Sequence, residues 1–282
     1  MKKRAKYNRN PYGFHREVVG RKRISQREKD SLQRRKIRRR FGLYKKMMAD
    51  DNLEELRNHH LTMTKSKADA LRGLYQYKAK KFKDLKLELT TTPKGRISNL
   101  CPYCQLEIVG TLDHILPKTP FPEYSTMPWN LIPCCATCNS KKDDDWLDEH
   151  NQRCFINFYI DDIPPVQYFY ADVSVVNGEI DIKYNLRFPA GYTSTLRARI
   201  ENHYKKLDLL KRYLENSDDV LEELRSVIRN YAHGVPDGEI ITSINNTCKD
   251  MQVLFGENYW KAVLERACVN TSAVFNLLKQ PQ

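Results

Sequence analysis

The chain has 282 residues, of which 40% are hydrophobic and 10% aromatic, so it holds enough apolar material for two or three compact units. It contains no run of 18 apolar residues and no apolar stretch behind its charged start, which predicts neither a membrane span nor a secretory signal. Eight cysteines in a chain of this length do not indicate a secreted disulfide scaffold, and we expect a protein of the reducing bacterial cytoplasm with no membrane partner.

Positive charge is concentrated near the N-terminus. The first 90 residues carry 28 Lys and Arg against 10 Asp and Glu, whereas the remaining residues carry 20 against 25. A basic head on a mildly acidic body favours a polyanionic partner, although a solvated run of charge is the alternative.

The first 20 residues combine one proline and two glycines with many cations, which predicts an arm that is flexible or ordered by binding. Over residues 24–48, four apolar residues recur at helical spacing, so one helix face can pack while the other presents cations. These apolar residues are Ile37, Phe41, Tyr44 and Met48. The cations that we expect to bind nucleic acid are Arg34, Arg35, Lys36, Arg38, Arg39 and Arg40. The same run is also typical of a nuclear import signal.

Two further helices are expected before a boundary at Thr90–Gly95. Asp50 or Asp51 can cap a short helix over 52–60, and Ser66 can cap a longer one. The apolar stripe predicted for the longer helix comprises Leu71, Leu74, Lys78, Phe82, Leu85 and Leu89. Residues 1–95 are therefore predicted to form a basic, helical, nucleic-acid-binding region.

Two Cys-x-x-Cys pairs stand in the middle of the chain, separated by 30 residues. They are Cys101 with Cys104, and Cys135 with Cys138. Four thiolates can hold one tetrahedral Zn²⁺ with no open position, so such a site is structural rather than catalytic. Cys134 is an alternative ligand, but Cys135 gives the spacing that lets two sulfurs of one pair face the same metal.

The segment between the two pairs is predicted to fold as strand, loop, strand and helix. The first strand ends at Asp113-His114 and stops at Pro117, and the second begins at Asn130. The helix begins around Cys138-Asn139.

This order of residues resembles the HNH endonuclease family, whose core is a ββα-metal fold, and the resemblance covers residues 96–149. It implies that His114 is the general base that activates water and that Asn130 holds the loop carrying it. It also implies that Asp113 and Asn139 bind one Mg²⁺ or Mn²⁺ through hard oxygen ligands. Lys118 and either Lys141 or Lys142 are expected to meet phosphates, with solvated surface charge as the alternative.

Residues 150–282 are predicted to form a β-hairpin followed by helices, suited to dimerisation or partner docking. Residues 166–176 and the alternating Ile180, Ile182 and Tyr184 flank Asn177-Gly178, a favoured type I′ turn. One apolar stripe runs through Leu196, Ile200, Tyr204, Leu207, Leu210 and Leu214. Another follows a cap at Ser217 and comprises Leu221, Leu224, Ile228 and Tyr231, with Gly234 as the stop. Two more helices are expected over about 239–254 and 258–279.

We therefore expect an α+β, mainly helical protein with a central zinc-stapled HNH module. Its predicted activity is metal-dependent hydrolysis of phosphodiester bonds in DNA, with RNA as an alternative substrate. A non-catalytic, zinc-stabilised nucleic-acid-binding protein and a homing or restriction endonuclease are alternatives. The general layout also resembles HNH subunits of Septu-type and retron-associated anti-phage systems. Because the chain lacks a P-loop, an ATPase partner in such a system would be a separate protein.

Overall fold

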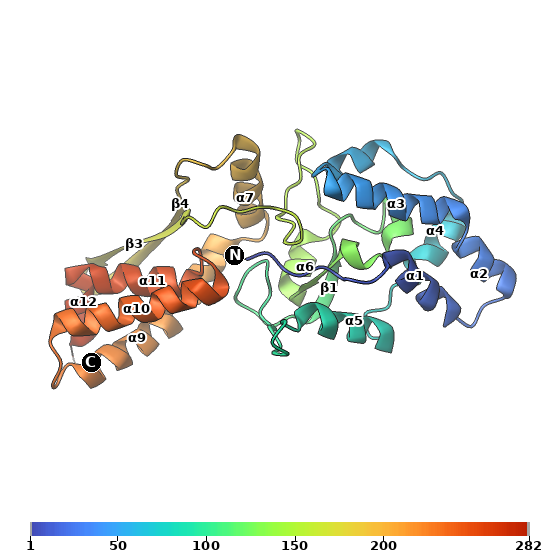
Figure 1. The fold of residues 1–282 in the computed structure, drawn as a ribbon. Helices are drawn as coiled ribbons and strands as arrows, with labels where there is room; N and C mark the ends of the chain where they lie inside the picture. Colours follow the sequence, from blue (N-terminus) through green and yellow to red (C-terminus); the bar gives the residue numbers. More distant parts are fainter. Residues whose placement is uncertain (1, 281–282) are drawn as a thin grey trace. The chain divides into compact units, whose positions relative to one another are not determined.

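The computed structural model describes residues 2–280 and combines many helices with two small antiparallel sheets, which confirms the expected α+β class. The chain divides into two compact units (Figure 1). The first unit runs from Lys3 to Asp162, so the basic region and the cysteine-bracketed segment belong to the same unit. The second contains Lys2 and the described chain from Ile163 to Gln280. None of the described helices is both long and apolar enough to cross a membrane.

Short helices form the N-terminal part of the first unit. They are α1 (Pro11–Gly20), α2 (Gln26–Leu32), α3 (Arg35–Ala49), the 3₁₀ helix η1 (Leu53–Asn58), α4 (Lys65–Arg72) and α5 (Lys80–Thr90). The expectation of an arm that is flexible or ordered by binding is wrong for the second half of residues 1–20, because Pro11–Gly20 is helix α1. The Asn10 side chain caps that helix by accepting hydrogen bonds from two backbone N–H groups. Phe14, Val18 and Val19 are buried, so the arm belongs to the core.

Helix α3 buries the four residues at helical spacing that the sequence indicated, which are Ile37, Phe41, Tyr44 and Met48. Helix α2 precedes it and begins with a capping box, in which the side chains and backbone N–H groups of Ser25 and Glu28 bond reciprocally. Most cationic residues of α3 therefore lie on the faces that the core does not use, and Arg40, whose side chain is largely buried, is the exception.

Two helix predictions in this part of the chain need correction. The segment expected as a short α-helix is the 3₁₀ helix η1, and the residue before it is Asn52 rather than a capping aspartate. The single helix expected from Ser66 is two helices, with Thr64 capping α4 and a break over 73–79. Gly73 ends α4, and Lys78 is exposed. The apolar stripe is nevertheless buried, because the two helices and the connecting turn share it.

The middle of the first unit contains strand β1 (Thr111–His114), strand β2 (Leu131–Cys134) and helix α6 (Ala136–Lys142). The strands pair antiparallel, with Asp113 opposite Ile132 and His114 opposite Leu131. Short 3₁₀ helices η2 (Pro122–Tyr124) and η3 (Pro128–Asn130) lie in the connecting loop. The order strand, loop, strand, helix agrees with the expectation.

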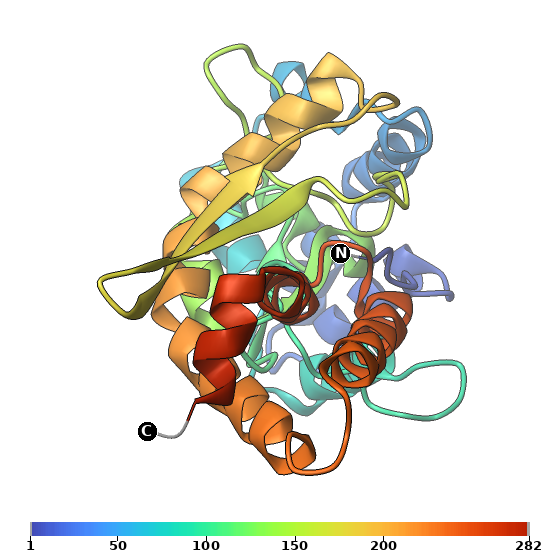
Figure 2. The same ribbon diagram turned by 90° about the vertical axis from the view of Figure 1, so that its left-hand side faces the viewer.

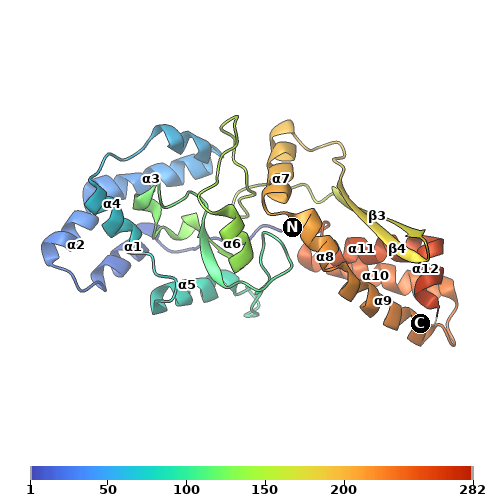
Figure 3. The same cartoon turned by 180° about the vertical axis from the view of Figure 1, so that it is seen from behind.

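The second unit is a hairpin packed on helices (Figures 2 and 3). Strands β3 (Phe169–Val176) and β4 (Glu179–Leu186) pair around Asn177 and Gly178, whose φ values of 52° and 83° are those of the predicted turn. The helices are α7 (Ser194–Lys206), α8 (Leu209–Glu215), α9 (Ser217–Tyr231), α10 (Asp237–Phe255), α11 (Trp260–Asn270) and α12 (Ser272–Lys279).

The structure corrects four sequence-based predictions for the helices of the second unit. The stripe from Leu196 to Leu214 spans two helices, because Asp208 adopts a left-handed conformation with φ of 51°. The helix expected over 258–279 divides into α11 and α12 at Thr271. Tyr231 is 57% exposed rather than inward-facing, and the hydroxyl of Ser217 donates to the Tyr213 carbonyl instead of capping α9.

Candidate active site and metal centre

The four cysteines of the two Cys-x-x-Cys pairs come together in the buried centre of the first unit. The sulfur atoms of Cys101, Cys104, Cys135 and Cys138 all lie within 4.8 Å of one another. In each pair a backbone N–H donates to a sulfur, from Leu106 to Cys104 at 3.4 Å and from Cys138 to Cys135 at 3.3 Å. The cluster joins the turn that precedes β1 to the first turn of α6.

This cluster fits a structural zinc ion. Cys104 and Cys135 have their sulfurs 3.8 Å apart, which is the edge of a tetrahedron whose Zn–S bonds are about 2.3 Å. Cys134 lies outside the cluster, and its thiol donates to the backbone carbonyl of Cys135. Because four thiolates complete a tetrahedral shell, a zinc ion held here has no position left for substrate.

Asp113 is held inside the protein at the end of β1. Its Oδ2 accepts a hydrogen bond of 2.8 Å from the Tyr103 hydroxyl and lies 3.4 Å from the Lys142 ammonium. Burial raises the pKa of Asp113, and the Lys142 charge and the Tyr103 hydrogen bond oppose this shift. Lys142 and Tyr103 therefore stabilise the ionised form of the Asp113 carboxyl group.

His114, the next residue, points to the other face of the strand. Its Nε2–H donates to the Ser125 carbonyl at 2.9 Å, so Nδ1 carries the free lone pair in the neutral ring. The Tyr75 ring packs edge-on against the imidazole with a centroid distance of 4.5 Å. Burial lowers the pKa of His114 from its ordinary value of 6.5 to about 3.

Asn130 is fully buried and fixes the chain that follows His114. Its Oδ1 accepts from the Leu116 N–H at 2.7 Å, and its Nδ2 donates to the Leu116 carbonyl at 3.0 Å. The Tyr44 hydroxyl of α3 also donates to Oδ1, at 3.2 Å. The loop between β1 and β2 is thus tied at its root by an amide and braced by a helix of the basic region.

Helix α6 brings Lys142 and Asn139 toward the end of β1. Lys142 is 1% exposed, and its ammonium donates to the His114 carbonyl at 2.8 Å. Asn139 lies three residues earlier, on the same face of the helix, and is half-buried. No hydrogen bond joins Asp113 to Asn139 among residues 2–280. One carboxylate and one amide are ligand types that Mg²⁺ or Mn²⁺ accepts, so the donor chemistry fits a hard divalent ion.

The predicted phosphate-binding cations are not equivalent. Seven of them are exposed to solvent, namely Arg34, Arg35, Lys36, Arg38, Arg39, Lys118 and Lys141. Arg40 instead pairs with the buried Glu123 at 2.9 Å, which ties α3 to the loop between β1 and β2. Lys118 lies over the Tyr75 ring, 5.6 Å from its centroid, and its charge helps to lower the pKa of His114.

Sequence reasoning missed Tyr75, Tyr103 and Tyr44 as neighbours of the site. Tyr75 lies in the turn between α4 and α5, where its hydroxyl donates to the Leu112 carbonyl. No spacing rule relates these tyrosines to Asp113 or His114. Tyr103 was the most accessible to prediction, because it sits inside a Cys-x-x-Cys pair.

Comparison with known proteins gives one similarity in sequence. The chain is 31% identical over 192 residues to protein ea31 of Escherichia phage lambda, covering 62% of this chain and 63% of that protein. The name of that protein states no activity. No protein-family model matches the chain, and no solved structure matches it.

Proposed function

We propose that the chain is a metal-dependent endonuclease of the HNH type that hydrolyses phosphodiester bonds in DNA. The observation that carries the proposal is the setting of His114. A neutral imidazole is fixed through Nε2 to the Ser125 carbonyl and directly follows a buried carboxylate in sequence, on a strand between the two clustered cysteine pairs. Because the Ser125 carbonyl accepts the hydrogen bond from Nε2–H, Nδ1 is unprotonated and can accept a proton, as a general base must.

His114 would take a proton from the attacking water at Nδ1. A pKa of about 3 makes the free ring a weak base, but an anionic phosphodiester beside it stabilises the imidazolium and raises that pKa. Asn130 acts as a positioning residue, because its two hydrogen bonds to Leu116 hold the chain just after His114.

Asp113 and Asn139 would hold the divalent ion. When bound, Mg²⁺ or Mn²⁺ supplies positive charge to the scissile phosphate and the leaving oxygen. Lys142, 3.4 Å from the Asp113 carboxylate, stabilises its ionised form. Lys118 and Lys141 are exposed and would contact phosphates on either side of the cut.

Substrate would be held electrostatically by the basic part of the first unit. A cavity of about 570 Å³ in this part is lined by Arg9, Arg16, Arg38 and Lys45 together with Trp129. The Lys6 ammonium lies 4.7 Å from the centroid of the Trp129 ring. Cations around an aromatic side chain suit a nucleic-acid backbone and its bases, so we expect binding to weaken steeply with salt.

A zinc-stabilised binding protein without catalysis is the second candidate. The observation that favours it is the engagement of Asp113 by Tyr103 and Lys142, which occupies the oxygen that a metal ion would use. Such a protein would bind DNA and leave it intact.

Incubation of the full chain with supercoiled plasmid distinguishes the two candidates. We expect nicked or linear product with Mg²⁺ or Mn²⁺, none with EDTA, and none from His114→Ala with either metal. His150→Ala is the matched control, because His150 is exposed and remote in sequence from the site. A gel shift without cleavage by zinc-loaded wild-type protein would favour the binding protein.

A further inference from the structure

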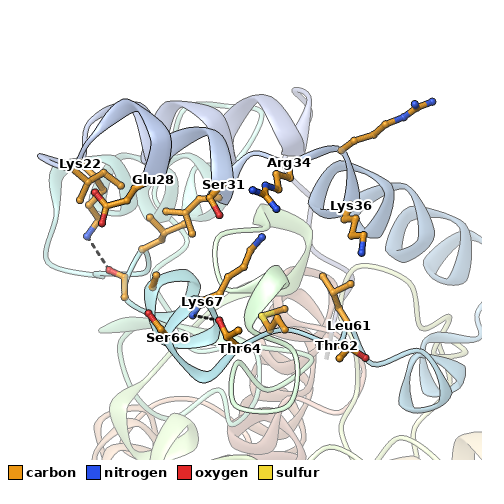
Figure 4. Close-up of a pocket in the computed structure, with 17 residues that line it drawn as sticks. Lys22, Glu28, Ser31, Arg34, Lys36, Leu61, Thr62, Thr64, Ser66 and Lys67 are labelled. Carbon is orange, nitrogen blue, oxygen red and sulfur yellow. Dashed lines mark hydrogen bonds between the residues drawn. The ribbon is translucent and has the colours of Figure 1, made fainter.

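A large cavity, here called the basic cavity, lies in the first unit away from the candidate active site (Figure 4). Its volume is about 880 Å³, and its walls come from the junction of α2 and α3 and from residues 61–74, which include α4. Cavities of this size hold small organic ligands. None of the residues assigned to metal binding or proton transfer lines it.

Cations from two separate segments converge on the basic cavity. Arg34 and Lys36 come from the start of α3, and Lys67 comes from the first turn of α4. Figure 4 shows Arg34 and Lys67 reaching toward one another across the space, with Lys36 directed downward beside Leu61.

These charges are not neutralised by the protein. Within residues 2–280, no carboxylate lies within ion-pairing distance of Arg34, Lys36 or Lys67. Glu28 also lines the cavity, but its carboxylate accepts hydrogen bonds from the backbone N–H and hydroxyl of Ser25. Burial, and then repulsion from Arg34 and Lys36, lowers the pKa of Lys67, as expected where positive potential is uncompensated.

Lys22 and Arg35 also line the cavity, and its remaining side chains are apolar or carry hydroxyl groups. The apolar residues are Ile24, Leu32, Leu61, Met63, Ala70 and Leu74. Hydroxyl groups come from Ser31, Thr62 and Ser66. The cavity thus combines anion-binding groups with an apolar surface, and a ligand that fits must contain both an anionic and a flat or apolar part.

We propose that the basic cavity binds a nucleoside phosphate, with the phosphates at Arg34, Lys36 and Lys67 and the base against the apolar lining. Arg34 offers a planar fork of donors that matches phosphate oxygens, and the two lysines add point charges. The ligand is either a free nucleotide or the terminal nucleotide of a strand, since both present the same chemistry. The proposal does not depend on the endonuclease activity.

Isothermal titration of the full chain tests this assignment. The probes are ADP, adenosine, tripolyphosphate, and a trinucleotide with or without a 5′-phosphate. We expect ADP or the 5′-phosphorylated trinucleotide to bind, and adenosine and tripolyphosphate each to bind at least about tenfold more weakly. Preference for ADP assigns the cavity to a free nucleotide, and preference for the phosphorylated trinucleotide assigns it to a strand end.

Two charge-removing variants locate the binding. Arg34→Gln and Lys67→Met should each weaken binding by about tenfold or more, because each removes a charged hydrogen-bond donor. Lys83→Met is the matched control, since it removes an exposed cation outside the cavity and should bind like wild type. Arg34 is exposed, so its loss should leave zinc content and thermal unfolding unchanged. Absence of binding by every nucleotide, equal affinity for tripolyphosphate, or wild-type affinity in both cavity variants would overturn the proposal.

Discussion

Single buried side chains decide the geometry around His114. Asn130 uses both ends of its amide on the backbone of Leu116, and Ser125 holds the imidazole through a carbonyl. These contacts make no use of charge, so they persist at any salt concentration.

Asn130→Ala should reduce both stability and cleavage. The buried Leu116 N–H loses its partner, which costs about 1–3 kcal/mol, and the chain that follows His114 is released. Thermal unfolding and plasmid cleavage, measured at a temperature where the variant is folded, check this expectation. Full cleavage by a destabilised variant would show that Asn130 supports the fold without positioning His114.

His15 predicts a pH dependence of stability that is separate from the site. It is fully buried between the Thr126 hydroxyl and the Leu32 carbonyl, and burial lowers its pKa from 6.5 to about 4. The unfolded chain therefore binds the proton more readily. The stabilisation is fully present above pH 6.5 and is lost as the pH falls toward 4, by up to roughly 3 kcal/mol.

Urea unfolding of wild type and His15→Gln at pH 7 and pH 4.5 measures this contribution. The wild type should lose more stability on acidification than the variant does, while His150→Gln, at an exposed position, should behave like wild type. The same loss in all three proteins would show that His15 does not titrate differently on folding.

At the scale of elements, local patterns were most informative where one short motif fixes one conformation. Asn177-Gly178 forms the predicted turn, and the α3 stripe is buried as predicted, because each depends on a few adjacent dihedral angles or one helix face. Helix ends were missed at Gly73 and Asp208, where a single residue interrupts an apolar stripe that continues into the next helix. Periodicity alone does not distinguish one long helix from two that share a core.

In the candidate site, too, local motifs could be predicted from the sequence and tertiary contacts could not. The four clustered cysteines could be predicted, because Cys-x-x-Cys spacing directly constrains where two sulfurs can point. Two contacts of the site could not be predicted from the sequence: the burial of Lys142 against Asp113 and the packing of Tyr75 on His114. They depend on how α6 and the α4–α5 turn pack against β1.

The cysteine cluster predicts which cysteines bind zinc, and this can be tested by substitution. Purified protein should contain one zinc per chain, and Cys135→Ser should lose the metal and unfold at lower temperature, because zinc binding contributes directly to folding. Cys134→Ser is the matched control and should keep the metal, since Cys134 lies outside the cluster. Elemental analysis and thermal unfolding check both variants. Zinc loss from Cys134→Ser with retention by Cys135→Ser would reverse the assignment of ligands.

At the scale of the whole molecule, the unit that contains the candidate site also carries the excess of positive charge, and the second unit contains none of the proposed catalytic or metal-binding residues. Dimerisation or partner docking through the second unit remains a prediction, as does a role in anti-phage defence, homing or restriction. A neighbouring gene for an ATPase or a reverse transcriptase would favour defence, and an intron would favour homing.

The most direct test of the account is the single-turnover rate of DNA cleavage by His114→Gly, measured with and without added imidazole. Loss of a general base predicts a rate reduced by about 10²–10⁴-fold, with partial recovery when imidazole enters the space left by the ring. Unfolding does not produce such recovery, so the rescue separates chemistry from structure. Cleavage at the wild-type rate by His114→Gly would contradict the assignment of His114 as the base.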